Sequence, residues 1–339
     1  MAPRIILGLM TFAPDPNAGG RLLSVSDLTT AFEQFSARGY TELDTARSYG
    51  GGAQEGFTRQ AGWKERGFSI ATKVYPLYAG AHRAEDITAA FETSLQELDV
   101  DCVDIFYIHA PDRTTPFTTT LAALNTLHTQ GKFRRLGLSN FSAFEVAEIV
   151  TTCHANNWVR PTVYQGVYNV IQRGVEAELI PACRRYGIDF IAYSPIAGGL
   201  LSGNLTSPDE VPEEGRFSDK FLGGFMRGHY FRDSVFAAVA ELKGVAERKG
   251  VSMIEIALRW LVHHSKIDVN KGDGIVLGVS KLEHLGSNLD ALEKGPLDVG
   301  VLEALEKVYK IAKVDQKPFW YGELVYGYHT SKELFGNGN

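Results

Sequence analysis

Four side chains of the kinds that transfer protons each follow a short apolar run in this sequence. Asp44 and Tyr49 come after the second such run, Lys73 ends the third, and His109 ends the fourth. A carboxylate, a phenol, an ammonium and an imidazole that meet in one place can deliver a proton to a carbonyl oxygen. Because strand ends are where a parallel barrel gathers its chemistry, the four residues predict an active site.

Each of the four residues also has an ordinary structural interpretation. Asp44 could cap a helix, and Lys73 could lie at the surface. His109 could serve in a turn, and Tyr49 could pack against the glycines that follow it. Their joint order, each just after an apolar run, favours catalysis over these separate roles.

The residue types suggest how such a site would work. A free tyrosine has a pKa near 10, and a nearby ammonium lowers it. We therefore expect Lys73 to lower the pKa of Tyr49 towards neutrality. Asp44 would hold Lys73 charged, and His109 would orient the carbonyl.

The elements that would position these residues repeat about eight times. Apolar, β-branched or aromatic runs mostly precede stretches of helical periodicity, which predicts an α/β fold with a parallel sheet. Eight units favour a (β/α)₈ TIM barrel over an open sheet, and no GxGxxG supports the alternative Rossmann fold. We expect a single domain over residues 1–339. The runs begin near Arg4, Tyr40, Phe68, Val103, Arg135, Thr162, Ile188 and Gly274.

Helical periodicity predicts further bounds. Early helices are expected over 26–38, 85–98 and 121–129, with Gly39 as a left-handed cap of the first. After the seventh strand, a long loop over 198–228 precedes helices at 234–249 and 252–264; a loop of this length indicates a lid or cofactor clamp. Helices at 282–292 and 299–313 and an aromatic tail follow the last strand. Capping boxes are predicted for Ser142 with Glu145, Ser252 with Glu255, and Ser280 with Glu283.

Composition excludes several classes of function. A net charge of −6 gives no broad attraction to nucleic acid or to an anionic membrane. Three scattered cysteines form neither a disulfide framework nor a zinc motif, so we expect a reducing, cytoplasmic environment and no metal site. No apolar run approaches the roughly 20 residues that span a bilayer.

Several motifs resemble the aldo-keto reductase superfamily over nearly the whole chain. They include Asp44-Thr-Ala-x-x-Tyr49, Ala71-Thr-Lys73 and Leu136-Gly-Leu-Ser-Asn140. The aflatoxin aldehyde reductase branch looks most similar, through His109-Ala-Pro-Asp112 and Val163-Tyr-Gln-Gly-Val-Tyr-Asn169. The resemblance implies a (β/α)₈ barrel that reduces carbonyls with NADPH, and in this branch a homodimer.

The same resemblance implies roles for individual residues. Tyr49 would be the general acid, Lys73 and Asp44 its tuning pair, and His109 the residue that orients the substrate. Polar residues at strand ends and one flat ring suggest a binding site for nicotinamide. The resemblance assigns this site to Ser139, Asn140, Gln165 and Tyr193. Taken singly, these four would be ordinary polar residues at the start of loops.

Phosphate and adenine contacts are expected on two segments. Glycines in the loop after the seventh strand would let the backbone approach the pyrophosphate, and Arg227 would cover it. The helix after the eighth strand would offer its N-terminus to the extra phosphate of NADPH. Its His284 departs from the arginine that many family members carry. The expected contacts are Ser194, Gly199, Leu200, Gly203, Arg227, Gly278, Ser280, Lys281, His284 and Asn288.

The substrate pocket is less legible from sequence. Candidate walls are Tyr75, Leu77, Phe141, Tyr230 and the tail aromatics, although each could equally pack in the core. Arg47 suggests the hypothesis of a negatively charged aldehyde. The carbonyl itself stays open among dialdehydes, semialdehydes, aryl aldehydes and secondary-metabolite intermediates.

Two other function classes are weighed against reduction. A cofactor-sensing regulatory subunit resembles the potassium-channel β-subunits of the same superfamily. A barrel aldolase would use Lys73 to form a Schiff base.

Overall fold

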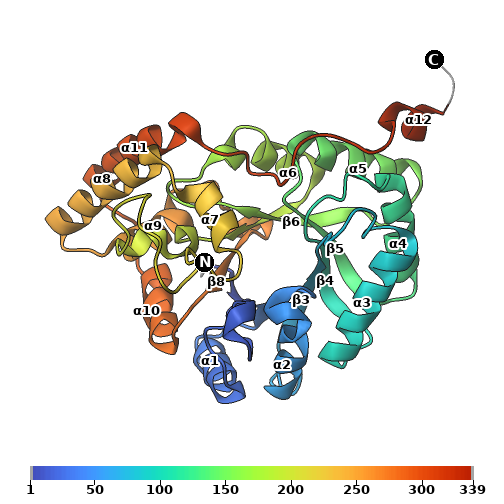
Figure 1. The fold of residues 1–339 in the computed structure, drawn as a ribbon, viewed down its shortest axis with the longest axis horizontal. Coiled ribbons are helices and arrows are strands. Elements are labelled where there is room, and N and C mark those ends of the chain that lie inside the picture. The colour runs from blue at the N-terminus through green and yellow to red at the C-terminus, as the bar shows by residue number, and fades with distance from the viewer. Residues whose placement is uncertain (1–2, 337–339) are drawn as a thin grey trace.

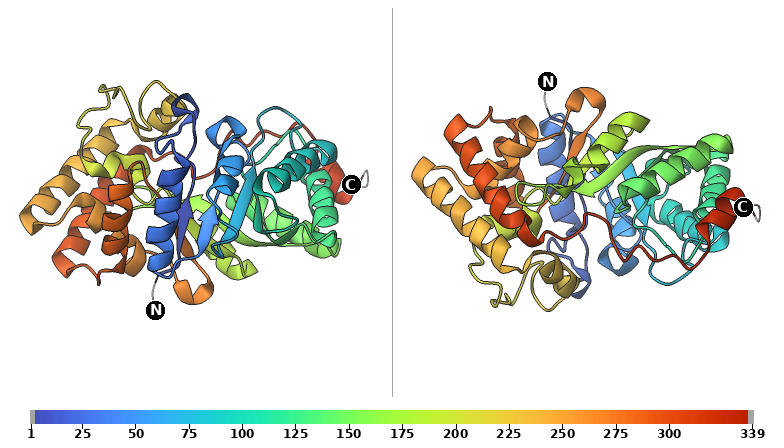
Figure 2. Two further views of the ribbon diagram at one scale, coloured as in Figure 1. Left: turned by 90° about the horizontal axis from the view of Figure 1, so that it is seen from below. Right: turned by 90° about the horizontal axis from the view of Figure 1, so that it is seen from above.

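Eight parallel strands close into a barrel, and helices cover its outside (Figures 1 and 2). The computed structural model describes residues 3–336. Each strand begins within two residues of its predicted start, and β1 pairs with β8 to close the sheet. The predicted (β/α)₈ barrel is therefore confirmed. The strands are β1 Ile5–Gly8, β2 Glu42–Asp44, β3 Ser69–Val74, β4 Val103–Ile108, β5 Phe133–Ser139, β6 Pro161–Val167, β7 Asp189–Tyr193 and β8 Gly274–Gly278.

A helix follows every strand, and more than one helix follows β7 and β8. Helices α7, α8 and α9 lie between β7 and β8, while α10, α11 and α12 follow β8. None of the helices in residues 3–336 has the length and apolar character to cross a membrane. The helices are α1 Val25–Ala37, α2 Gln54–Gln60, α3 Ala84–Leu98, α4 Phe117–Thr129, α5 Ala143–Ala155, α6 Leu179–Tyr186, α7 Gly223–Tyr230, α8 Asp233–Lys249, α9 Met253–His263, α10 Leu282–Glu293, α11 Val299–Ala312 and α12 Thr330–Phe335.

Most predicted helix ends agree with the structure to within a residue or two. Gly39 has a φ of 80° just after α1, as a left-handed cap requires. Helix α4 begins four residues earlier than predicted, because a run of threonines with weak helix propensity hides its first turn. The capping box at Ser142 is present in full, and Ser252 caps α9. The box predicted at Ser280 is wrong, since Lys281 occupies the cap position without a side-chain bond.

The long connection after β7 is only partly irregular. The prediction of a loop through residue 228 is wrong for its last part, where α7 forms. The sequence does not indicate α7, because the two glycines at its start have low helix propensity. Gly223 is required there, because a Cβ would come within 1.5 Å of the carbonyl oxygen of Ser218.

Alternation along the strands separates two apolar layers. One set of side chains packs between the sheet and the helices, and a second, smaller set fills the barrel interior. Adjacent strands β4 and β5 bring Tyr107 opposite Gly137. A Cβ at Gly137 would lie 2.2 Å from the Tyr107 ring, so the glycine makes room for the largest interior side chain. The interior set is Ile6, Ala71, Ile105, Tyr107, Val163, Ile191 and Val276.

We expect Gly137→Ala to destabilise the protein by about 1–3 kcal/mol, because the added methyl overpacks the barrel interior against Tyr107. Chemical denaturation measures the change. Gly286→Ala is the matched control: its Cβ would enter open space on α10, where alanine stabilises a helix by roughly 0.5–1 kcal/mol. Equal stability of the Gly137→Ala variant and the parent would contradict this account of the interior.

Candidate active site

Strand alternation directs the predicted catalytic and nicotinamide residues into the barrel mouth. Lys73 stands two positions after the interior residue Ala71, and His109 stands two after Tyr107. Residues two apart on a strand share a face. The same spacing puts Gln165 after Val163 and Tyr193 after Ile191.

Lys73 is the centre of a buried polar cluster. Its ammonium is fully buried and donates to Asp44 Oδ2 at 2.7 Å and to the carbonyl oxygen of Thr45 at 2.6 Å. Gln165 reaches across the barrel and donates to Asp44 Oδ1 at 2.8 Å. Burial alone lowers the pKa of Lys73, but the charge of Asp44 and the phenol of Tyr49 outweigh burial and raise it. Lys73 is therefore held charged, as the sequence predicts for the pair.

Tyr49 begins a tight turn beyond β2. The turn continues through two glycines, Gly50 and Gly51, with φ of 58° and 64°, a conformation that glycine adopts without strain. The Lys73 ammonium lies 5.1 Å from the centre of the Tyr49 ring. Burial raises the pKa of Tyr49, and Lys73 opposes that rise without cancelling it. The expected net lowering is thus not found, and Tyr49 keeps its proton at neutral pH.

His109 completes the group of four. Its ring stands edge-on to Tyr49, with 5.7 Å between ring centres, and edge-on to Tyr75 at 5.4 Å. Burial, followed by the charges of Lys73 and His82, lowers the pKa of His109 well below its ordinary value. The imidazole is therefore neutral, and its Nδ1 has no hydrogen-bond partner within residues 3–336.

The predicted nicotinamide residues lie beside this group. Asn140 adopts a left-handed φ of 63° and donates to the His109 carbonyl at 2.8 Å and to Ser139 Oγ at 3.0 Å. The Tyr193 hydroxyl donates to Asn140 Oδ1 at 2.8 Å. Ser139, Asn140 and Tyr193 thus lie together at the ends of β5 and β7, and Gln165, two residues before the end of β6, lies opposite Ser139 in the sheet.

The residues of the glycine-rich loop after β7 differ in their surroundings. Ser194 and Gly199 have left-handed φ, and a Cβ at Gly199 would meet nothing within 4 Å, which leaves its backbone open to a ligand. The Leu200 side chain is fully buried, so only its backbone could contact a cofactor. A Cβ at Gly203 would lie 2.4 Å from Met253 Cε, so packing against α9 explains that glycine.

Two arginines of the long connection bear on the expected phosphate contact. Arg227 donates to the carbonyl of Phe217 and to Asp219, each at 2.6 Å, and so braces the connection itself. Arg216 was not predicted. Burial lowers the pKa of the Arg216 guanidinium, whereas the phenol of Tyr49 acts to raise it.

The start of α10, where the sequence predicts a phosphate contact, follows the end of β8. No side chain caps the helix, so its first amides are free of side-chain acceptors. Ser280, Lys281 and His284 are exposed around it, and Asn288 is buried one turn further on. Gly278, at the end of β8, has open space where a Cβ would be.

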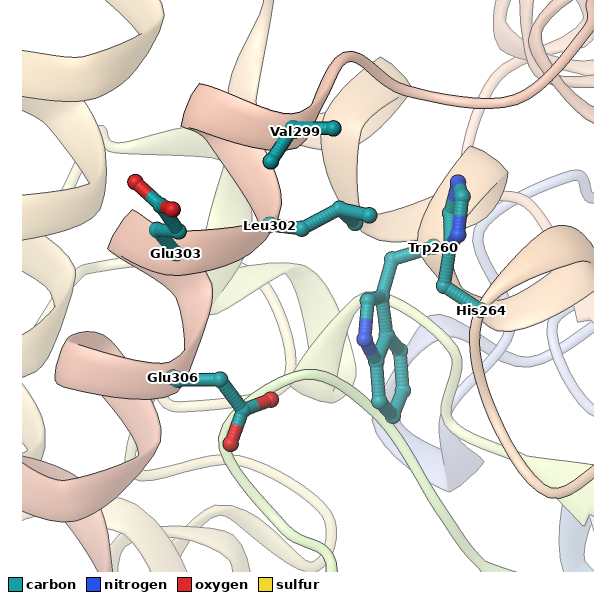
Figure 3. A pocket seen from close by; sticks show the side chains of 6 residues that line it. All are labelled: Trp260, His264, Val299, Leu302, Glu303 and Glu306. Carbon is teal, nitrogen blue, oxygen red and sulfur yellow. The ribbon is translucent and has the colours of Figure 1, made fainter.

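The candidate substrate walls divide between the mouth and other places. Tyr75 lies against His109, whereas Phe141 packs on Phe117 between sheet and helices and is not a wall. Leu77 is 74% exposed, and Tyr230 is buried. A separate groove of about 310 Å³ lies between α9 and α11 and contains none of the predicted site residues (Figure 3).

The contacts of Arg47 do not support the hypothesis that it attracts a negatively charged aldehyde. Arg47 pairs with the fully buried carboxylate of Glu55 at 2.6 Å, and Thr72 donates to the same carboxylate at 2.5 Å. The charge of Arg47 is thus satisfied within the fold rather than presented to a ligand.

Sequence reasoning did not single out Arg216, and it named Tyr321 only among the tail aromatics that are candidate walls. Arg216 stands in an irregular segment without periodicity. Tyr321 belongs to the aromatic tail, which the sequence predicts as a candidate wall of the substrate pocket without indicating which ring would enter the site. Its hydroxyl lies 3.0 Å from that of Tyr193.

Comparisons with known proteins agree with this geometry. The Aldo/keto reductase family profile matches residues 4–310. An aldo-keto reductase of Pseudocercospora fijiensis is 40% identical over 287 residues, 83% of this chain and 97% of the relative. Aflatoxin B1 aldehyde reductase member 2 of Mus musculus is 39% identical over 321 residues, 92% and 86% of the two chains.

A solved structure extends the likeness to the fold. The aldo/keto reductase from Klebsiella pneumoniae, solved in complex with NADP and acetate, aligns with a TM-score of 0.67 and 23% identity. The alignment covers 94% of this chain and 95% of that one. With the family profile and the close relatives, this chain belongs to the aldo/keto reductase family and is an oxidoreductase.

Proposed function

We propose that this protein reduces aldehydes, and reactive ketones or dialdehydes, to alcohols with NADPH. The observation that carries the proposal is the convergence of Asp44, Tyr49, Lys73 and His109 at one end of the barrel. Family membership implies a small carbonyl substrate, and the relatives named as aflatoxin B1 aldehyde reductases support an aldehyde.

The residues of the mouth fit a nicotinamide dinucleotide. Asn140, Gln165 and Tyr193 offer amides and a flat ring near the reacting centre, and the open backbone at Gly199 suits a pyrophosphate. Arg227 remains a candidate for a phosphate contact, although its guanidinium also pairs with the exposed Asp219, and Arg216 of the same connection is a second candidate. The uncapped start of α10 would accept a further phosphate.

Each catalytic side chain then has one task. NADPH, when bound, supplies hydride to the carbonyl carbon. Tyr49, protonated because burial raises its pKa, donates its proton to the carbonyl oxygen. The charge of Lys73 stabilises the tyrosinate that this transfer leaves, and Asp44 holds Lys73 in place.

His109 has the remaining task. A neutral imidazole can donate one hydrogen bond to the carbonyl oxygen without competing for the proton of Tyr49. Its lowered pKa keeps it in that form.

We expect Tyr49→Phe to lower kcat for aldehyde reduction by at least about 100-fold, because the phenol is the proton donor. Loss of NADPH absorbance across a carbonyl panel measures turnover, and fluorescence quenching measures an unchanged Kd for NADPH. Tyr40→Phe, which removes a hydroxyl that bonds Glu293 far along the chain, is the matched control. Undiminished turnover by Tyr49→Phe would refute the assignment; NADPH binding by the parent without reduction of any carbonyl would favour a cofactor-sensing regulator.

The two shifted pKa values predict a flat pH profile for kcat. Protonation of His109 would begin well below its ordinary pKa of 6.5, and loss of the Tyr49 proton would begin above 10. We therefore expect kcat for reduction to stay level between these values, measured with deuterated NADPH to verify that hydride transfer limits the rate. A fall in kcat centred within that range, in a protein that stays folded, would contradict a protonated Tyr49 beside a neutral His109.

Preference for NADPH over NADH should depend on the start of α10. We expect Lys281→Ala to raise KM for NADPH roughly 10-fold, the loss of one hydrogen bond between charged groups, and to leave KM for NADH unchanged. Lys294→Ala, just past the opposite end of the same helix, is the control, because Lys294 pairs with Glu255 instead. An equal effect of Lys281→Ala on both cofactors would place the phosphate elsewhere.

A further inference from the structure

Two neighbouring residues of β3 point to opposite sides of the sheet. Lys73 faces the barrel mouth, where its ammonium approaches the ring of Tyr49. Successive side chains of a strand alternate, so Thr72 faces the helices instead, and it donates to Glu55 Oε1 of α2 at 2.5 Å. Helices α2 and α3 pack on each other beside this strand (Figure 1). The carboxylate that Thr72 holds therefore lies on the opposite side of β3 from the Lys73 ammonium.

Glu55 is a buried carboxylate that the proposed reduction does not use. Its side chain is 0% exposed, and its charge is balanced by Arg47, whose Nη1 lies 2.6 Å from Glu55 Oε2. Burial raises the pKa of Glu55, whereas the charge of Arg47 and the hydrogen bond from Thr72 lower it. Because the cost of burying a carboxylate is offset only by cations and donors at fixed places, Glu55 fixes the position of the Arg47 guanidinium.

Arg47 holds both ends of the turn that carries Tyr49. Its amide donates to the carbonyl of Lys73 at 2.9 Å before the turn, and its guanidinium donates to the carbonyl of Gly52 after it. Residues 50–52 are all glycines with left-handed φ, and glycine has the freest backbone, so this run does not by itself fix the direction of Tyr49. A Cβ at Gly52 would lie 3.0 Å from Arg47 Nη2, so this glycine leaves room for the guanidinium.

We propose that Arg47, anchored by Glu55, is a positioning residue for Tyr49. Arg47 closes the glycine turn, so the phenol keeps one position relative to the Lys73 ammonium. Without that tie the turn is free to adopt other conformations, and proton transfer loses its alignment; a misplacement of about 1 Å costs up to roughly 100-fold in rate. The inference rests on the proposed reductase function, in which Tyr49 is the proton donor.

Arg47→Met removes the tie and keeps most of the length of the side chain. We expect kcat for aldehyde reduction to fall roughly 10- to 100-fold, while KM for the aldehyde and Kd for NADPH change less than about twofold. Arg184→Met is the matched control. Arg184 pairs with Asp273, which is as buried as Glu55 but stands just before β8 begins, at the end of the barrel away from the mouth. This control should lose stability in the same way and keep the kcat of the parent.

Two further variants test whether Arg47 acts through Tyr49. In Arg47→Met/Tyr49→Phe the proton donor is already absent, so the double variant should keep the residual kcat of Tyr49→Phe, whereas a merely structural role would lower kcat further. Glu55→Gln removes the charge that anchors Arg47, keeps the shape of the side chain and leaves no buried carboxylate unpaired. It should lower kcat roughly 5-fold, the loss of one charge-assisted contact.

The outcomes separate this inference from the function on which it rests. Circular dichroism verifies that the variants fold. A parent that reduces aldehydes while Arg47→Met and Glu55→Gln keep its kcat would overturn the inference, and so would a double variant far less active than Tyr49→Phe. If Arg47→Met does not fold, an unchanged kcat in Glu55→Gln overturns the inference by itself. A parent that reduces no carbonyl would instead overturn the proposed function.

Discussion

The burial of one ammonium group organises the mouth of this barrel. Removing the charge of Lys73 from water costs several kcal/mol, and that cost is offset only if acceptors stand in the right places. Asp44 and the carbonyl of Thr45 supply them from β2 and its extension, and Gln165 fixes the second oxygen of Asp44 from β6. A charged Lys73 therefore requires that β2 pair with β3. It also requires that the barrel close, because closure places β6 opposite β2.

The same charge sets the properties of its neighbours. It opposes the effect of burial on Tyr49 and adds to the effect of burial on His109. The outcome is a protonated phenol beside a neutral imidazole, a combination suited to giving a proton rather than taking one. Burial is the largest cause of both pKa shifts. The sequence suggested a lowered pKa for Tyr49 because residue types reveal charges, whereas the depth of a site is a property of the folded chain.

Periodicity predicted the barrel, and it predicted that Asp44, Tyr49, Lys73 and His109 would lie together, since both depend on local order. Each strand start was found to within two residues, because apolar runs and helical repeats are local signals. Lys73 and His109 could be placed because they end such runs. Helix α7 and the contacts of Arg227 within the long connection could not be predicted, because glycines and an irregular segment carry no repeat. Tyr321 reaches the site only through contacts with residues such as Arg113 that lie far away in the sequence.

Closure of the sheet through β1 and β8 has a consequence for synthesis. Strand β1 pairs early with β2, but its other edge pairs with β8, where Ile5 lies opposite Ile275, so that edge stays unpaired until most of the polypeptide has been made. Until then the nascent chain presents unpaired edges on β1 and β7, which are the surfaces that aggregate. Such distant pairing slows folding, and we expect demand for chaperones during translation to be greatest just before the last strand leaves the ribosome.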